Sequence, residues 1–156
     1  MIRAYDKTYL EDAMLNLAVA LDYGSIACAG GIDEFYDRML AGNVIRQFEK
    51  GNPKYVSGLS GIELGKRIIE STGGHVGDYN YVLDDRSAIF WTGWVLAYLQ
   101  WHTNLPFESL NAKGIDVHRV MDMYPAFHEA DISKFVTSAL KIMSNSETDV
   151  SPLKRQ

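Results

Sequence analysis

The residues best equipped for chemistry lie close together at His128, Glu129 and Asp131. An imidazole beside two carboxylates can transfer protons, and the same groups can hold a cation. A zinc-protease helix needs a second histidine four residues after the first, and position 132 is isoleucine, so we predict at most a loose cluster, with no metal site and no cofactor. Together with Tyr98, these three residues are candidates to line a small-ligand cleft.

A structural role explains the same acids. Glu129 and Asp131 stand just before a strongly periodic apolar segment, where acidic side chains oppose the positive end of a helix dipole. Asp84, Asp85 and Arg86 pose the same choice, because two neighbouring carboxylates suit acid–base chemistry, whereas acids that precede a helix usually cap it. For both groups the capping interpretation is favoured.

The sequence holds no other catalytic motif. A nucleophile elbow would need glycines on both sides of Ser60, and the second position is occupied by Ile62. Neither a phosphate-binding loop nor a dinucleotide-binding fingerprint occurs, and the other three histidines are not spaced as pairs. We therefore favour a non-enzymatic protein that binds another protein. Its candidate contact residues are polar and aromatic groups at the ends of predicted elements: Lys54, Tyr55, Arg86, His102 and His128.

Composition limits the partners. The chain has 156 residues, 47% of them apolar, which suits one domain with one core, and its formal net charge is −5. A general nucleic-acid binder normally carries a strongly basic face. That role would require five bases of the middle region to share one face: Arg46, Lys50, Lys54, Lys66 and Arg67.

The number of cysteines and the length of the apolar segments indicate the cellular compartment in which the protein is expected. Cys28 is the single cysteine, and Ile26, Ala27 and Ala29 around it predict a small buried thiol in a reducing compartment. The N-terminal residues lack the apolar core of a signal peptide, and the longest mostly apolar run, 88–99, is too short to span a bilayer. We expect a cytoplasmic protein without membrane partners.

Apolar residues recur at three- and four-residue steps, and no alternating strand pattern of convincing length occurs. Ser60 and Glu63 have capping-box spacing, Gly51 and Pro53 give a stop, and one helix must end before Pro125. The predicted helices cover residues 8–23, about 33–50, 60–71, 84–103, about 106–110, 116–124 and 127–143. We predict an all-α fold, a single compact orthogonal bundle of about five to seven helices.

The domain is expected to span residues 1–143. Residues 144–156 are polar and contain a proline, which is typical of a disordered tail. The linker at 72–83, with Tyr79 and Tyr81, could be a loop or a short extended piece.

The aromatic segment at 84–103 is expected to form the central helix. Trp91, Trp94, Tyr98 and Trp101 fall at helical spacing within it, and large rings bury more surface than other side chains. The rings could instead stack on a ligand, but core packing is the default. If the Trp94 ring is fully buried, Trp94→Ala should lower the free energy of unfolding by about 3 to 5 kcal/mol.

Several strings resemble a family of small uncharacterised helical proteins of gut bacteria. They are residues 51–56 (GNPKYV), 60–64 (SGIEL), 91–98 (WTGWVLAY), 100–101 (QW) and the ends of 124–131 (YP and HEAD). The resemblance covers most of residues 5–143. Members are associated with gene neighbourhoods that hold ADP-ribosyltransferase-like toxin or mobile-element genes. This implies a role in bacterial conflict, as an antitoxin-like or inhibitor protein, and it implies no catalytic residue.

Overall fold

The computed structural model describes residues 2–77 and 80–153, with side chains as far as Glu147. Within these residues all regular structure is helical, which confirms the all-α fold. The α-helices are α1 (Leu10–Ala27), α2 (Gly31–Ala41), α3 (Val44–Glu49), α4 (Gly61–Ser71), α5 (Ala88–Thr103), α6 (Phe107–Ala112), α7 (Val117–Phe127) and α8 (Ile132–Leu153). A 3₁₀ turn, η1 (Lys7–Tyr9), precedes α1, and a π-helical turn, η2 (Lys54–Gly58), lies between α3 and α4.

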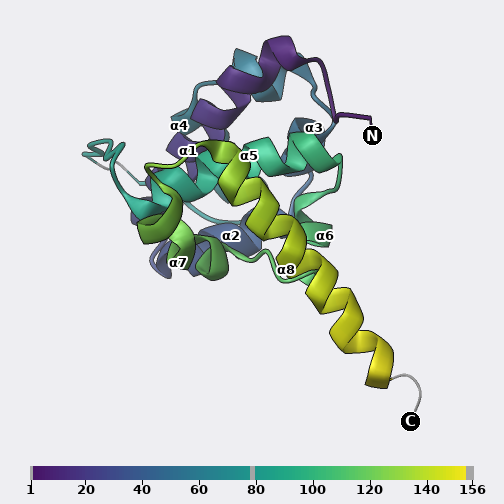
Figure 1. Ribbon diagram of the computed structural model, residues 1–156. Helices are drawn as coiled ribbons and strands as arrows, with labels where there is room; N and C mark the ends of the chain where they lie inside the picture. The colour runs from purple at the N-terminus through teal and green to yellow at the C-terminus, as the bar shows by residue number, and fades with distance from the viewer. Residues whose placement is uncertain (1, 78–79, 154–156) are drawn as a thin grey trace.

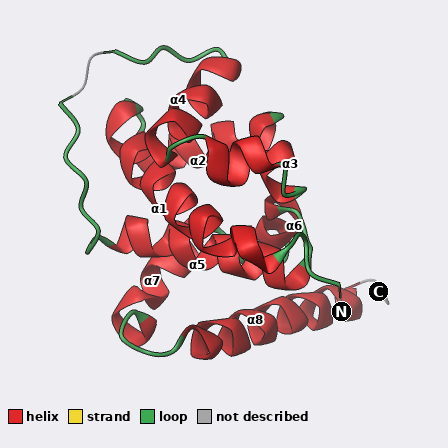
Figure 2. Ribbon diagram, turned by 90° about the horizontal axis from the view of Figure 1, so that it is seen from above, coloured by secondary structure: helices red, strands yellow, loops and turns green. Residues whose placement is uncertain are grey.

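The aromatic segment forms α5, which crosses α1 at the centre of the bundle (Figure 2). The two helices touch through small residues, because a Cβ at Gly93 would lie 2.7 Å from the Cα of Ala18 and 2.7 Å from the carbonyl oxygen of Leu17. Ala97, one turn later, is also fully buried. The close crossing brings the two backbones together, and the larger side chains of α5 must therefore lie to either side of it.

The glycines at the start of α4 serve packing. A Cβ at Gly61 would lie 2.4 Å from the Cβ of Val19, and one at Gly65 would lie 2.9 Å from the Tyr23 ring. The predicted cap is confirmed, since Ser60 Oγ accepts the backbone N–H of Glu63 at 3.2 Å. These glycines let α4 lie close against α1.

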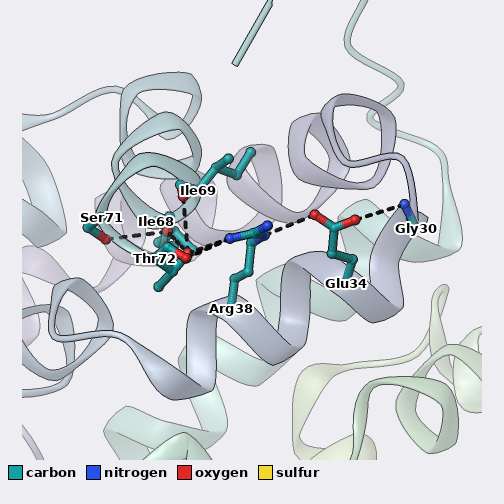
Figure 3. A network of polar contacts seen from close by, with 7 residues as sticks. All are labelled: Gly30, Glu34, Arg38, Ile68, Ile69, Ser71 and Thr72. Atoms are coloured by element: carbon teal, nitrogen blue, oxygen red, sulfur yellow. Dashed lines mark hydrogen bonds and ion pairs between the residues drawn. The ribbon is translucent and has the colours of Figure 1, made fainter. Parts of the chain in front are cut away.

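A polar network fastens α2 to the end of α4 (Figure 3). The Arg38 guanidinium donates to Glu34 through Nε (2.9 Å) and to the Thr72 carbonyl through Nη1 (2.8 Å). Glu34 also accepts the backbone N–H of Gly30 at 3.0 Å. The Arg38 and Gly30 hydrogen bonds lower the pKa of Glu34. The network therefore satisfies the last carbonyls of α4 where the following linker begins.

The linker between α4 and α5 runs outside the helices (Figure 2), and its described residues form a loop. Tyr79 lies outside the described residues. Asp22 of α1, which is 4% exposed, accepts hydrogen bonds from Tyr81 Oη (2.6 Å), the Asp84 N–H (3.2 Å) and Ser87 Oγ (3.1 Å). Ser87 in turn caps α5 by accepting the Phe90 N–H at 2.9 Å. One buried carboxylate thus fixes the entry into α5.

Several expected helix boundaries are wrong, since α1 continues past Tyr23 to Ala27 and α5 begins at Ala88, four residues after the expected start. The helix expected to end at Lys50 is interrupted at Gly42 and Asn43, which separates α2 from α3. The helix expected to end before Pro125 continues to Phe127. A proline near a helix end removes only one hydrogen bond, and the last turn is kept by the His128 N–H, which donates to the Tyr124 carbonyl at 3.0 Å.

The final helix begins at Ile132, not Phe127, and Asp131 caps it by accepting the Ser133 N–H at 3.0 Å. Its apolar stripe packs on α5 and α7, with Phe135 and Ala139 buried. Where the sequence led us to expect a disordered tail from 144, α8 continues to Leu153 and extends past the other helices (Figure 1). Residues 154–156 lie outside the described part.

Cys28 is buried as expected, and this burial together with the nearby Glu34 carboxylate raises the pKa of its thiol to about 11. The thiolate is therefore scarce near neutral pH. Of the helices in the described part of the chain, none has both the length and the apolar character that crossing a bilayer requires.

Candidate functional site

A surface pocket of about 430 Å³ opens where the start of α5 meets the end of α7. Its walls are mostly aromatic, with charged groups among them. The lining residues are Asp85, Arg86, Phe90, Trp91, Trp94, Tyr124, His128 and Glu129. The pocket therefore contains Arg86 and His128, two residues of the expected protein-contact set. It also contains Glu129, which together with His128 belongs to the expected ligand cleft.

The rings of the pocket hold one another in place. Trp91 meets Tyr124 edge to face at 5.8 Å between ring centroids, and it meets Phe135 of α8 in the same way at 5.6 Å. Tyr124 stacks on His128 at 4.2 Å with 19° between the ring planes. Because α5, α7 and α8 each supply a ring, tertiary packing fixes the aromatic wall before any ligand arrives.

Trp94 corrects the expectation that all three tryptophans are core residues. Its side chain is among the exposed large apolar groups, at 38% exposure, whereas Trp101 is 6% exposed. The crossing with α1 is made at Gly93, which is buried, whereas the next residue along the helix, Trp94, is exposed. Large exposed aromatic surface is typical of an interaction site when it gathers with others of its kind.

The charged rim is placed by backbone contacts. Tyr124 Oη donates to the Arg86 carbonyl at 2.7 Å, which ties the turn before α5 to α7. The Arg86 N–H donates to Asp84 Oδ1 at 3.1 Å, and Asp84 is itself held by Asp22. The expectation that Asp84 or Asp85 caps the helix is therefore wrong, because Ser87 caps α5 and Asp84 accepts an N–H of the preceding turn.

His128 stands at the end of α7 with a fixed orientation. Its Nδ1–H donates to the Tyr124 carbonyl at 2.7 Å, because a carbonyl oxygen only accepts. Nε2, the acceptor nitrogen of a neutral ring, lies 3.4 Å from Oε1 of Glu129. The Glu129 side chain is 88% exposed, so solvent screens this contact strongly.

The other predicted residues lie elsewhere. Asp131 caps α8, and the hydrogen bonds from Ser133 lower its pKa. Tyr98 stacks on His102 at 5.9 Å and does not line the pocket, so the cleft expected from four residues is reduced to two of them. Burial and the nearby Arg3 lower the pKa of His102.

Lys54 and Tyr55 lie on η2, where the Lys54 ammonium sits 5.7 Å from the Tyr55 ring centroid. The five expected contact residues therefore fall in three separate places. Lys54 and Tyr55 lie together on η2, His102 lies near the end of α5, and Arg86 and His128 line the pocket.

A second hollow, of about 480 Å³, lies beside α3 and α6. Several of its polar and charged groups already make internal contacts. Glu49 accepts the Phe107 N–H at 2.7 Å, Gln100 donates to the Glu49 carbonyl at 3.2 Å, and Arg46 bonds to the Gly42 carbonyl and lies 3.7 Å from Glu108. We therefore regard the aromatic pocket as the better candidate site.

Phe90 and Tyr124 were not among the sequence candidates for a site, whereas acid–base chemistry at Asp85 and ligand stacking by Trp94 were considered and ranked below structural roles. The available signal was Gly93, whose small size marks the face of α5 that packs on α1. The described residues contain no group of three or more histidine, cysteine or acidic side chains placed to hold a metal ion.

Comparison with protein families, with curated proteins and with solved structures finds no match to this chain.

Proposed function

We propose that this chain is a non-enzymatic protein-binding module and that the aromatic pocket between α5 and α7 is its interaction site. The observation that carries the proposal is the exposure of Trp94 beside a wall of interlocked rings. Tryptophan, tyrosine and arginine dominate the residues that contribute most to protein–protein binding, and such residues cluster in pockets. Trp94, Tyr124 and Arg86 provide this combination in one place.

Preorganisation supports the proposal. The walls are fixed by ring–ring contacts, and Asp22 and Tyr124 fix the turn that carries Arg86. A partner that inserts a side chain here therefore pays little ordering entropy on this side of the interface.

The resemblance to proteins from toxin gene neighbourhoods supports a more specific role. We propose that the partner is a toxin encoded nearby, that binding inhibits it, and that the complex forms in the cytoplasm. Co-expression tests this role: the chain should relieve growth arrest caused by the toxin, and the Trp94→Ala variant should not.

Affinity capture from the native host tests the interaction site. The chain and its Leu140→Ala variant should retain one stoichiometric protein partner, whereas Trp94→Ala and Arg86→Ala should lose it. Leu140 is the matched control because it is also 38% exposed and lies on α8 away from the pocket lining. A partner kept by all four proteins would contradict the assignment of the site.

A small-ligand or enzymatic role is the second candidate, favoured by the geometry of His128. The Tyr124 carbonyl holds its Nδ1–H, which leaves Nε2 as a basic nitrogen beside Glu129. If no protein is captured by any variant, a thermal-shift screen of small molecules with His128→Ala as control should find a stabilising ligand.

A further inference from the structure

The pocket combines aromatic faces with an excess of acid. The carboxylates of Asp85 and Glu129 line it, together with one permanently charged base, Arg86, and the imidazole of His128. The end of α7, which carries the negative pole of its dipole, lies at the same place, because Tyr124 and His128 belong to its last turn. The positive pole of α5 is already matched by the Ser87 cap and by the preceding Asp84. The local field therefore favours a cation.

The aromatic faces lack a cation of their own. Within the described residues, two cation–π contacts occur, Arg3 over Trp101 at 5.4 Å and Lys54 over Tyr55 at 5.7 Å. No described lysine or arginine lies over Trp91, Trp94 or Tyr124, although Arg86 lines the same pocket. Trp101 and Tyr55, by contrast, each carry a cation of this chain over the ring.

Trp94 is the most available of these rings. Trp91 and Tyr124 already contact other rings, whereas Trp94 makes no ring contact within the described side chains. Tryptophan is the aromatic side chain that binds cations best, and Trp94 is 38% exposed.

We infer that the pocket binds an arginine side chain of the partner protein, an inference that rests on the proposed protein-binding function. A guanidinium is planar, so it can stack on the Trp94 indole, and its fork of N–H donors can reach a carboxylate in a bidentate manner. Glu129 is 88% exposed in the unbound chain and is available as that acceptor. Asp85, in the turn before α5, adds a second carboxylate to the pocket lining.

The test compares an arginine ligand with its uncharged isostere, citrulline. N-acetyl-arginine amide and N-acetyl-citrulline amide have nearly the same size and planar end group, but only the first is a cation. Binding is followed by NMR through the three indole N–H signals, assigned with Trp94→Phe and Trp91→Phe variants. The arginine derivative should shift the Trp94 and Trp91 signals saturably, at a concentration about tenfold lower than the citrulline derivative needs. The buried Trp101 signal should stay in place.

Glu129→Gln is the matched variant, because it keeps the shape of the side chain and removes its charge. It should weaken arginine binding several-fold and leave citrulline binding unchanged. Equal binding of the two ligands, or arginine shifts no larger at Trp94 than at Trp101, would overturn the inference. Loss of the captured partner in Trp94→Ala would still stand in that case, so failure of the arginine assignment is separable from failure of the proposed function.

Discussion

The carboxylate of Asp22 accepts the hydroxyl of Tyr81 at 2.6 Å, across 59 positions of the chain. The contact joins the middle of α1 to the linker that leads to the pocket. The Tyr81 ring also meets Tyr23 edge to face at 5.4 Å, and burial together with this hydrogen bond raises the pKa of Tyr81. Asp22 therefore positions the turn that carries Asp85 and Arg86 while touching neither side chain.

Replacing Asp22 with alanine should destabilise the protein by about 2 to 4 kcal/mol, because three donors lose a buried acceptor. Asp22→Asn keeps one acceptor oxygen and should cost less. Urea unfolding measures both changes, and limited proteolysis should show faster cleavage in the linker of the alanine variant. Unchanged cleavage would mean that Asp22 does not anchor the linker.

Truncation of the tryptophans should separate core from surface. Trp101→Ala should cost about 3 to 5 kcal/mol, because the ring is 6% exposed and its Nε1–H donates to the Tyr5 carbonyl at 2.8 Å. Trp94→Ala should cost less than about 2 kcal/mol, since much of its ring already faces water. Chemical denaturation of both variants decides the matter, and equal losses would place Trp94 in the core.

The crossing of α1 and α5 should not tolerate a single added methyl group. Gly93→Ala should destabilise by about 2 to 3 kcal/mol or more, because the new carbon would meet backbone atoms of Leu17 and Ala18 that cannot move independently. Gly58→Ala is the control, since its Cβ would lie no closer than 3.4 Å to any neighbour. It should change stability by less than about 0.5 kcal/mol. A Gly93 variant that melts with the parent would refute the close crossing.

Glu49 should make stability depend on pH. Burial raises its pKa, while the Phe107 N–H and Arg46 act in the opposite direction. An acid with a raised pKa in the folded state favours folding at low pH, and this contribution is lost as pH rises through the folded pKa.

Glu49→Gln keeps an acceptor for Phe107 and removes the charge, so its stability relative to the parent should increase from about pH 4.5 towards pH 8. Glu108→Gln, whose side chain is 74% exposed, should show no such trend. Urea unfolding across this range provides the measurement. A constant difference between Glu49→Gln and the parent would exclude the charge as the cause.

Local signals predicted much of the fold. The capping spacing of Ser60 and Glu63 located the start of α4, and the apolar repeat around Phe135 located α8. What failed were features decided by tertiary context. Pro125 lies in the last turn of α7, which is kept by a hydrogen bond from the N–H of His128, the residue after the helix. The apolar repeat of residues 33–50 shows no break at Gly42, although the chain turns there between α2 and α3.

The candidate site was only partly predictable for a similar reason. α5 is apolar on all sides, so periodicity cannot indicate which rings face inward. His128 and Arg86 were identified because they are polar residues at element ends. Trp94 was assigned to the core and Tyr124 was not singled out, because the exposure of each ring depends on which faces of α5 and α7 are covered by neighbouring helices.

The contact at Gly93 has a consequence for how such a protein can diverge. α5 meets α1 through small residues and carries its exposed ring on another face, so helix packing and the lining of the pocket depend on different positions of one helix. Substitutions at the exposed ring and at the charged rim should therefore reshape the pocket with little loss of stability. A lineage that keeps the small crossing residues is free to vary the lining of its pocket.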